Sequence, residues 1–206
     1  MAQFFTIHPE NPQQRLIDQA VEILQRGGLI VYPTDSAYAL GCHIGDKMAL
    51  DRIRALRQLD KYHNFTLMCR DLSELATYAK VDNAAFRLIR NHTPGPYTFI
   101  LNGTSEVPRR LMNPKRKTIG MRVPNNLIAL ALMERLGEPL MSSSLILPND
   151  KFPLTDPYEI RAVLEHQVEL IIDGGYCGME PTTVVDLTGD APVVTREGCG
   201  SIAELQ

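Results

Sequence analysis

Apolar and polar residues alternate with two different periods along this chain, and these periods predict interleaved helices and strands. Positions 16, 17, 20, 21 and 24 are apolar, which places them on one face of a helix, and Gly27-Gly28 ends the segment. We expect this helix to begin at Pro12, behind an N-cap at Asn11. The apolar run 29–33 that follows directly is typical of a buried strand.

The same two patterns recur to the end of the chain. Helical spacing predicts helices over 47–57, 72–79, 83–91 and 126–135. A further helix is predicted to begin at Pro157, behind Asp156, and to turn Ile160, Val163 and Leu164 inward. Short apolar runs predict strands over 65–69, 97–101, 117–123, 139–141, 168–172, 182–187 and 192–196. The Asn/Asp/Pro-rich stretch 148–157 is predicted to be a mobile loop. With no repeat or long linker, the pattern favours one domain over 1–206, of class α/β or α+β, around a largely buried sheet.

Small polar residues gather where several predicted strands start or stop. Thr34-Asp35-Ser36 follows the strand at 29–33, and Ser142-Ser143-Ser144 closes the run 139–141. Arg122 ends the strand at 117–123, and Thr182-Thr183 opens the strand at 182–187. One such cluster is ordinary turn chemistry. Four of them favour a polar small-molecule site, since ligands bind at the carboxyl ends of strands in open α/β sheets.

Composition narrows the class of protein. The 206 residues are 44% hydrophobic and 22% charged, as in ordinary globular domains, with a net charge of −3. The four cysteines form no C-x-x-C pair and the five histidines show no ligand spacing, so we expect reduced thiols and no protein-bound metal. Neither a signal-peptide pattern nor an apolar run near the ~20 residues of a membrane span is present. We therefore expect a cytoplasmic protein with no membrane partner.

The common nucleotide and hydrolase motifs are missing from the sequence. It contains no G-x-x-x-x-G-K-[ST], no G-x-S-x-G and no His-Glu-x-x-His. A basic stretch stands out instead, with no acid in its fourteen residues: Arg109, Arg110, Lys115, Arg116, Lys117 and Arg122. The simple interpretation is a solvated loop, and the functional one is a surface that contacts the phosphates of RNA or of a nucleotide. No aromatic residues interleave with these cations, so stacking on single-stranded bases is not indicated.

Taken together, the motifs resemble the YrdC/YciO family. The landmarks occur in family order: Tyr32-Pro33-Thr34-Asp35-Ser36, Pro94-Gly95-Pro96-Tyr97-Thr98, Met121-Arg122-Val123-Pro124, Ser142-Ser143-Ser144, and Thr182-Thr183-Val184-Val185 with Arg196-Glu197-Gly198. Details at 36–40 and 63–70 resemble the YciO branch. The resemblance implies an α/β fold with a twisted open mixed sheet, helices on both faces and a positively charged concave surface.

The resemblance also implies function. Synthases of the family make threonylcarbamoyl-adenylate from L-threonine, bicarbonate and ATP, with Mg²⁺ entering alongside ATP, for tRNA modification. Members have also been linked to binding of double-stranded RNA on the concave face. We therefore expect a protein that binds RNA, either double-stranded RNA or tRNA, together with nucleotide, and that has weak or diverged synthase activity. The alternatives are an RNA-binding module without catalysis and a hydrolase of a related adenylate.

Family roles transfer to matching positions only. The resemblance assigns catalysis to Arg57, Thr34 and Arg122; substrate contacts to Thr34, Ser36, Arg122 and Thr183; nucleotide contacts to Ser142, Ser144, Thr182 and Arg196; and RNA contacts to Arg109, Arg110, Lys115, Arg116 and Lys117. Three positions depart from the synthase pattern. Leu59 stands in place of one cation of a Lys-x-Arg pair, His63 in place of a lysine, and Ile146 in place of the asparagine of Ser-x-Asn. Losing one cation at a phosphoryl-transfer site costs about two to three orders of magnitude in rate.

Overall fold

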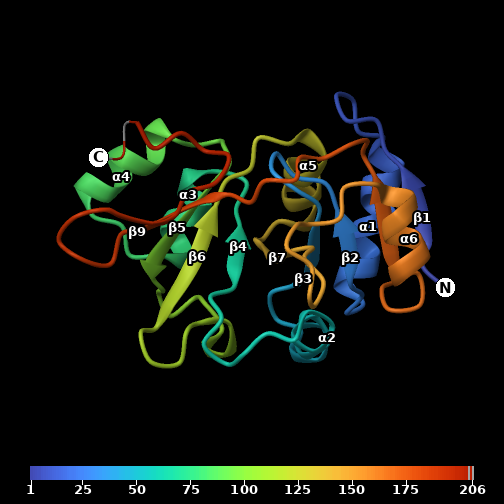
Figure 1. The fold of residues 1–206 in the computed structure, drawn as a ribbon, viewed down its shortest axis with the longest axis horizontal. Helices are drawn as coiled ribbons and strands as arrows, with labels where there is room; N and C mark the ends of the chain where they lie inside the picture. The colour runs from blue at the N-terminus through green and yellow to red at the C-terminus, as the bar shows by residue number, and fades with distance from the viewer. Residues whose placement is uncertain (204, 206) are drawn as a thin grey trace.

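The fold is a ten-stranded mixed sheet, seen in a computed structural model that describes residues 1–203 and 205 (Figure 1). The strands lie in the order β1-β8-β2-β3-β7-β4-β6-β5-β9-β10. Their bounds are β1 Gln3–Thr6, β2 Ile30–Tyr32, β3 Ala39–His43, β4 Thr66–Met68, β5 Tyr97–Asn102, β6 Thr118–Arg122, β7 Leu140–Ser144, β8 Leu170–Asp173, β9 Thr183–Asp186 and β10 Val193–Arg196. The predicted open mixed sheet is confirmed, with β1 and β10 at its two edges.

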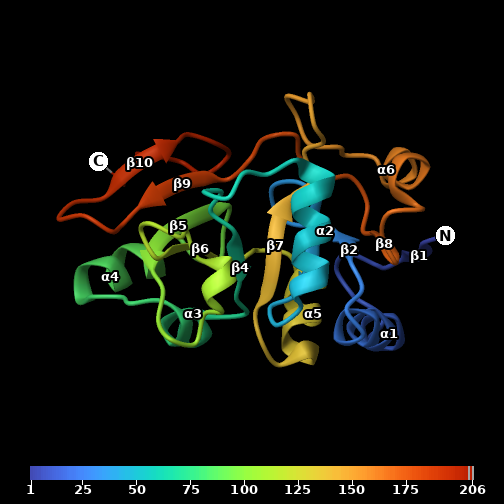
Figure 2. The same cartoon turned by 90° about the horizontal axis from the view of Figure 1, so that it is seen from below.

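Helices cover both faces of the sheet, as predicted. In the described chain they are α1 Gln14–Gln25, α2 Lys47–Arg57, α3 Leu72–Tyr78, α4 Asn83–Asn91, α5 Leu127–Leu136 and α6 Pro157–Leu164, with a short 3₁₀ turn η1 at Arg109–Leu111. Aspartate caps begin four of them; for example, the carboxylate of Asp46 accepts from Ala49 N at 2.8 Å and starts α2. Figure 2 shows α1 and α5 side by side on one side of the sheet.

One face of the sheet is apolar across its centre. Cross-strand partners form an unbroken buried row from β3 to β9: Cys42, Met141, Leu67, Met121, Phe99 and Val185. Helices α2, α3, α4 and α6 bury this face in one cluster, with Leu50, Ile53, Leu75 and Ile160 among its members. Burial of this continuous apolar row stabilises the sheet.

The opposite face divides into two halves. At the end of the sheet formed by β8, β2 and β3, residues such as Ile30 and Tyr32 pack against α1 and α5. Toward β9 the same face turns polar, and one row of cross-strand partners runs Ser142, Thr66, Gly120, Ile100 and Asp186. The strand period of two therefore places apolar side chains in the core and small polar ones on an uncovered floor.

The sequence predictions needed four corrections. Strands β1 and β3 were not predicted. The serines do not follow a strand but form the body of β7. Helix α1 begins at Gln14 instead of Pro12, with an N-cap at Gln13 that makes no side-chain cap bond. Asn11 lies in a bend two residues before this N-cap, where its N–H bonds His8 Nδ1 at 3.1 Å, so the predicted cap at Asn11 is wrong.

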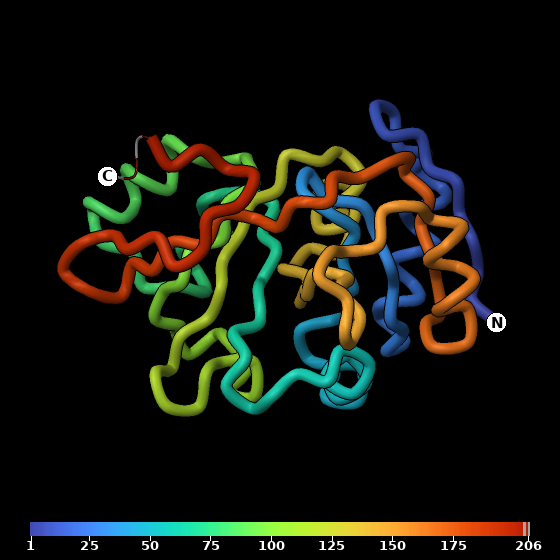
Figure 3. The backbone as a smooth tube through the Cα atoms, in the orientation of Figure 1, coloured from blue at the N-terminus to red at the C-terminus, as the bar shows by residue number. Residues whose placement is uncertain are grey.

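The chain crosses the whole sheet between its last strands. β8 lies between β1 and β2, whereas β9 lies beside β5 near the other edge. The connecting segment 174–182 runs across the molecule in Figure 3 and is tied to the loop after β2: Cys177 Sγ donates to Thr34 O at 3.6 Å, and Tyr38 Oη donates to Gly175 O at 2.6 Å. Within the described part of the chain, no helix is both long and apolar enough to span a membrane.

Candidate active site

A cavity of about 430 Å³ opens over the polar half of the sheet. Its floor carries the polar row described above, and its walls come from the loop after β2, the C-terminal end of α2 and strand β10. The cavity brings together seven of the residues to which the resemblance assigned catalysis, substrate or nucleotide: Ser36, Arg57, Arg122, Ser142, Ser144, Thr182 and Arg196. Hydroxyl and guanidinium groups from distant parts of the chain therefore share one hollow.

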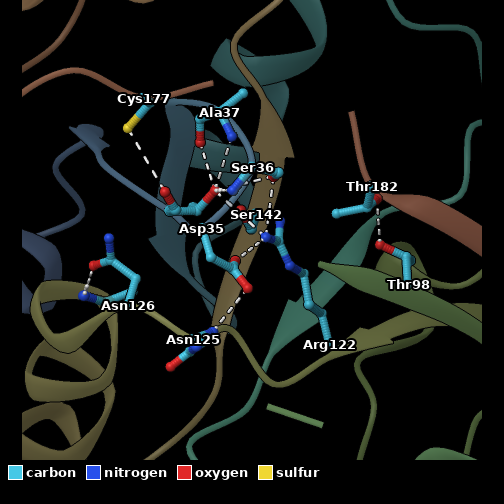
Figure 4. A network of polar contacts seen from close by, with 12 residues as sticks. Asp35, Ser36, Ala37, Thr98, Arg122, Asn125, Asn126, Ser142, Cys177 and Thr182 are labelled. Carbon is cyan, nitrogen blue, oxygen red and sulfur yellow. Dashed lines mark hydrogen bonds and ion pairs between the residues drawn. The ribbon is translucent and has the colours of Figure 1, made fainter. Parts of the chain in front are cut away.

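Arg122 is the central cation of the cavity (Figure 4). Its guanidinium donates to the Asp35 carboxylate and to Ser36 Oγ at 3.0 Å, and lies 3.5 Å from Thr34 Oγ1. The side chains of Arg122 and Asp35 are only 7% and 10% exposed, so this ion pair is buried. Asn125 N holds the second Asp35 oxygen at 2.9 Å. Arg122 Nε is buried with no hydrogen-bond partner among the described residues, which is unusual for a buried donor.

Thr34 lies in the loop after β2, next to Arg122. It is buried, its hydroxyl donates to Ala37 O at 2.5 Å, and it accepts from Ala37 N and from Ser36 N at 3.2 Å. The side chain is thus engaged in the turn that follows β2, and it is not among the residues that line the cavity. Its hydroxyl thus fixes the turn that carries Ser36, and the substrate contact expected of Thr34 stays a prediction.

The serines of β7 divide between two partners. Ser142 lies on the floor, and its hydroxyl accepts from Tyr32 Oη at 2.7 Å; Ser144, two residues on, lines the same cavity. Ser143 accepts from the guanidinium of Arg57 at 2.6 Å, and Arg57 Nε donates to the Ile146 carbonyl at 2.9 Å. Arg57 is therefore fixed at the end of β7 by neutral oxygens.

Thr182, just before β9, and Thr183, its first residue, face opposite ways. Thr182 lines the cavity, accepts from the guanidinium of Arg196 at 3.0 Å and lies 2.9 Å from Thr98 Oγ1. Thr183 is fully buried on the other side, where it donates to Gly200 O at 2.6 Å and accepts from Gly198 N at 3.0 Å. Thr183, for which a substrate contact was predicted, therefore does not line the cavity. Its hydroxyl group instead stabilises the turn after β10.

The basic stretch does not act as one uniform patch. All five residues assigned to RNA are exposed, but Arg116 also lines the cavity and pairs with Asp186 at 2.7 Å. Arg110 bonds the Gly45 carbonyl. Lys115 Nζ lies 4.8 Å from the centre of the Tyr62 ring, with Lys61 Nζ at 5.1 Å. The fold thus brings an aromatic ring beside cations that the sequence order did not interleave.

Some residues of the cavity were not predicted. The floor and walls also contain Asn64, Thr66, Thr98 and Asp186, along with His63, which the sequence marked only as a departure. Alternation along β4 and β5 was the signal available, since Thr66 and Thr98 share a face with apolar neighbours two residues on. Among the described residues, no group of three His, Cys, Asp or Glu side chains could hold a metal ion.

Burial shapes the charges of the site. Burial, with Arg196 nearby, lowers the pKa of the Arg57 guanidinium, and burial also lowers the pKa of Arg196. Burial lowers the pKa of His63 to about 4, reinforced by Arg57. At neutral pH the imidazole is consequently uncharged, while arginine stays protonated because its ordinary pKa is far higher.

Residues 22–198 match the family model Sua5/YciO/YrdC, described as telomere recombination. Uncharacterized protein YciO of Escherichia coli K12 is 68% identical over 202 residues, 98% of each chain. A crystal structure of E. coli YciO aligns over 100% of both chains with a TM-score of 0.98. Threonylcarbamoyl-AMP synthase of Chromobacterium violaceum is 35% identical over 137 residues, 66% of this chain and 70% of that one.

A second similar structure is that of a ligand complex. Pyrococcus abyssi Sua5 complexed with L-threonine aligns with a TM-score of 0.88 and 28% identity, over 96% of this chain and 58% of that one. The chain described here belongs to the Sua5/YciO/YrdC family. Its curated relatives include threonylcarbamoyl-AMP synthases, and its overall similarity is greatest to YciO among the relatives named above.

Proposed function

We propose that the cavity binds ATP, with its Mg²⁺, and L-threonine, and that the protein makes threonylcarbamoyl-AMP at a low rate. In this reaction the threonine amine and bicarbonate form a carbamate with loss of water. A carbamate oxygen then attacks the α-phosphorus of ATP, the α–β phosphate bond breaks, and pyrophosphate leaves. The cytoplasmic location expected from the sequence stays a prediction.

The observation that carries the proposal is the shared cavity with its unpaired donors. Its volume of about 430 Å³ is within the usual range for small-molecule sites. Arg122, with a buried and unpartnered Nε, is suited to the carboxylate of threonine, since guanidinium groups bind carboxylates through parallel donors. Arg57 and Arg196, which bond only neutral oxygens in the described structure, are suited to the phosphates.

The low rate is proposed from the three departures. Leu59 lies against the apolar core and supplies no charge, and Ile146 lines the cavity where an amide would donate and accept. Phosphoryl transfer depends on charge stabilisation at the phosphate, so each missing donor raises the barrier. A rate reduced by about two to three orders of magnitude follows from the loss of one such group.

The test is synthesis of the adenylate at high protein concentration. Protein is incubated with ATP, Mg²⁺, L-threonine and bicarbonate, and threonylcarbamoyl-AMP and pyrophosphate are measured against a blank without protein. Arg57→Gln is expected to lower the rate at least a hundredfold, while Arg26→Gln, on an exposed side chain, leaves it unchanged. Absence of product above the blank refutes the proposed synthesis.

A gain-of-function arm sharpens this test. Ile146→Asn supplies an amide at the cavity wall and is expected to raise the rate about tenfold, which corresponds to about 1.4 kcal/mol of barrier. Ile146→Ala is the matched control, because it changes volume without adding an amide. Supplied threonylcarbamoyl-AMP provides the hydrolase arm: consumption of the adenylate with no synthesis assigns the cavity to hydrolysis instead.

We propose binding of double-stranded RNA or tRNA as a second function, on the exposed basic stretch beside the cavity. Supporting it, Arg109, Arg110, Lys115, Arg116 and Lys117 are all exposed. Binding to a short duplex is expected to fall steeply with salt and to weaken with Lys117→Ala or Arg110→Ala, with Arg26→Ala as control. Salt-insensitive or absent binding refutes it. Tyr62→Ala separates the modes, since only single-stranded RNA gains from stacking on an exposed ring.

A further inference from the structure

Three basic side chains from separate elements meet at one wall of the cavity. Arg57 ends α2, Arg196 ends β10, and His63 lies in the loop between α2 and β4; all three line the cavity. Within the described chain neither arginine has an ion-pair partner: Arg57 donates to Ser143 and Ile146, and Arg196 donates to Thr182. The half-buried Arg57 and the more exposed Arg196 therefore both lack a counter-charge at the cavity wall, which favours an anion in the space they border.

His63 differs from its two neighbours because its charge depends on its surroundings. Its ring packs edge-on against Phe65, with centroids 5.3 Å apart, and no hydrogen bond to the ring is found in the described residues. After burial, Arg57, Arg54 and Arg196 are the groups that disfavour the charged imidazole, and Asp60 alone opposes them. The free protein thus holds a neutral imidazole with both nitrogens available, beside two fixed positive charges.

We propose that His63 completes an anion site with Arg57 and Arg196 and takes up a proton when a phosphate-bearing ligand enters the cavity. The inference rests on the proposed nucleotide site and deepens it. A polyphosphate brings more negative charge than the two arginines cancel, so the field at the imidazole changes sign. The protonated ring then donates to a phosphate oxygen in a charge-assisted hydrogen bond. Anion affinity consequently depends on pH, as it would not with a permanently charged lysine at this position.

The size of the effect follows from proton linkage. With the ordinary histidine pKa of about 6.5 in the bound state and about 4 in the free state, the affinity at pH 6 exceeds that at pH 8 by about fourfold. Under the same assumption the ligand brings about 0.75 proton onto the ring at pH 6 and about 0.25 at pH 7. These values exclude the titration of the ligand itself, which a variant must remove.

Calorimetric titration with ATP and, separately, inorganic pyrophosphate, in buffers of different ionisation enthalpy, counts the protons taken up. His63→Gln is the comparison, because subtracting its proton count removes the contribution of the ligand. His166→Gln is the matched control, since that side chain is 75% exposed at the end of α6. We expect wild type and His166→Gln to take up the calculated extra fraction of a proton and His63→Gln none. His63→Lys is expected to bind with no extra proton uptake and with less pH dependence.

The outcomes separate the inference from the proposed function. Binding of ATP with identical proton counts in wild type and His63→Gln overturns the role of His63 and leaves the nucleotide site standing. Pyrophosphate binding with proton uptake, but no ATP binding, supports the anion site and refutes the nucleotide proposal. No binding of either ligand refutes both. The His63 imidazole NMR signal, assigned by its loss in His63→Gln, is an independent check when it is followed against pH, because the midpoint of its titration rises on ligand addition only if the bound ring holds its proton more tightly.

Discussion

Neutralising both members of the Arg122–Asp35 pair is expected to destabilise the protein by less than the sum of the two single neutralisations. The pair is buried, with side-chain exposures of 7% and 10%, and lies at the centre of the candidate site. Arg122→Met leaves the Asp35 carboxylate with the Asn125 N–H as its remaining partner. Asp35→Asn leaves a buried guanidinium with neutral oxygens only.

The magnitude follows from the cost of an uncompensated buried charge. Each single substitution is expected to cost about 3–5 kcal/mol of unfolding free energy. For a chain of 206 residues, this corresponds to a fall in Tm of roughly 6–20 °C. The double variant removes both charges, so its cost is expected to be at least about 2 kcal/mol below the sum of the singles.

Urea unfolding followed by circular dichroism at pH 7 measures all three variants. Arg135→Met is the matched control, because its ion pair with Asp18 has exposures of 53% and 39%, and such surface pairs contribute less than about 1 kcal/mol. Single variants that cost no more than this control, or a double variant equal to the sum, would refute the assignment of a buried, coupled pair.

Three further outcomes are expected. Gly120→Val is expected to lower the free energy of unfolding in urea by about 1–3 kcal/mol, because a Cβ there would lie 2.8 Å from Thr66 Oγ1. The same clash on the cavity floor should weaken ATP binding, and an unchanged ATP affinity contradicts this expectation. Thr183→Val costs about 1–3 kcal/mol through the lost bonds to the turn 198–200, while threonine affinity stays unchanged, as calorimetry can measure. Burial raises the pKa of Glu74 above 4.5, so ionisation of this carboxyl lowers the free energy of unfolding as pH rises. Between pH 4.5 and 8 the urea midpoint of Glu74→Gln should therefore fall less than that of the wild type.

Much of the fold could be predicted because local signals and packing agree. The helix over 47–57 was predicted with its observed bounds, since Asp46 caps its start and the apolar spacing is regular. β3 was missed because Ala39–His43 contains Gly41, a weak strand former, and shows no clear alternation. It is a strand because β2 and β7 pair with it on both sides, and that information is not local.

The candidate site was predictable as a set of residues but not as a geometry. The resemblance predicted ligand contacts for both Thr182 and Thr183. Adjacent residues of an extended chain face opposite sides, however, and only Thr182 lines the cavity. The serine run has a composition common to turns and strands, so only its cross-strand partners decide which side chains form the floor. The pairing of Arg116 with Asp186 joins residues seventy positions apart, which no local pattern encodes.

The place of β8 between β1 and β2 has a consequence for synthesis of the protein. A ribosome that has not yet passed residue 170 presents β1 and β2 without the strand that separates them. The backbone N–H and C=O groups along one edge of each strand then await a late partner, and pairing across such a long stretch of chain is slow. Nascent chains of this family member are therefore expected to need protection from aggregation until β8 has emerged.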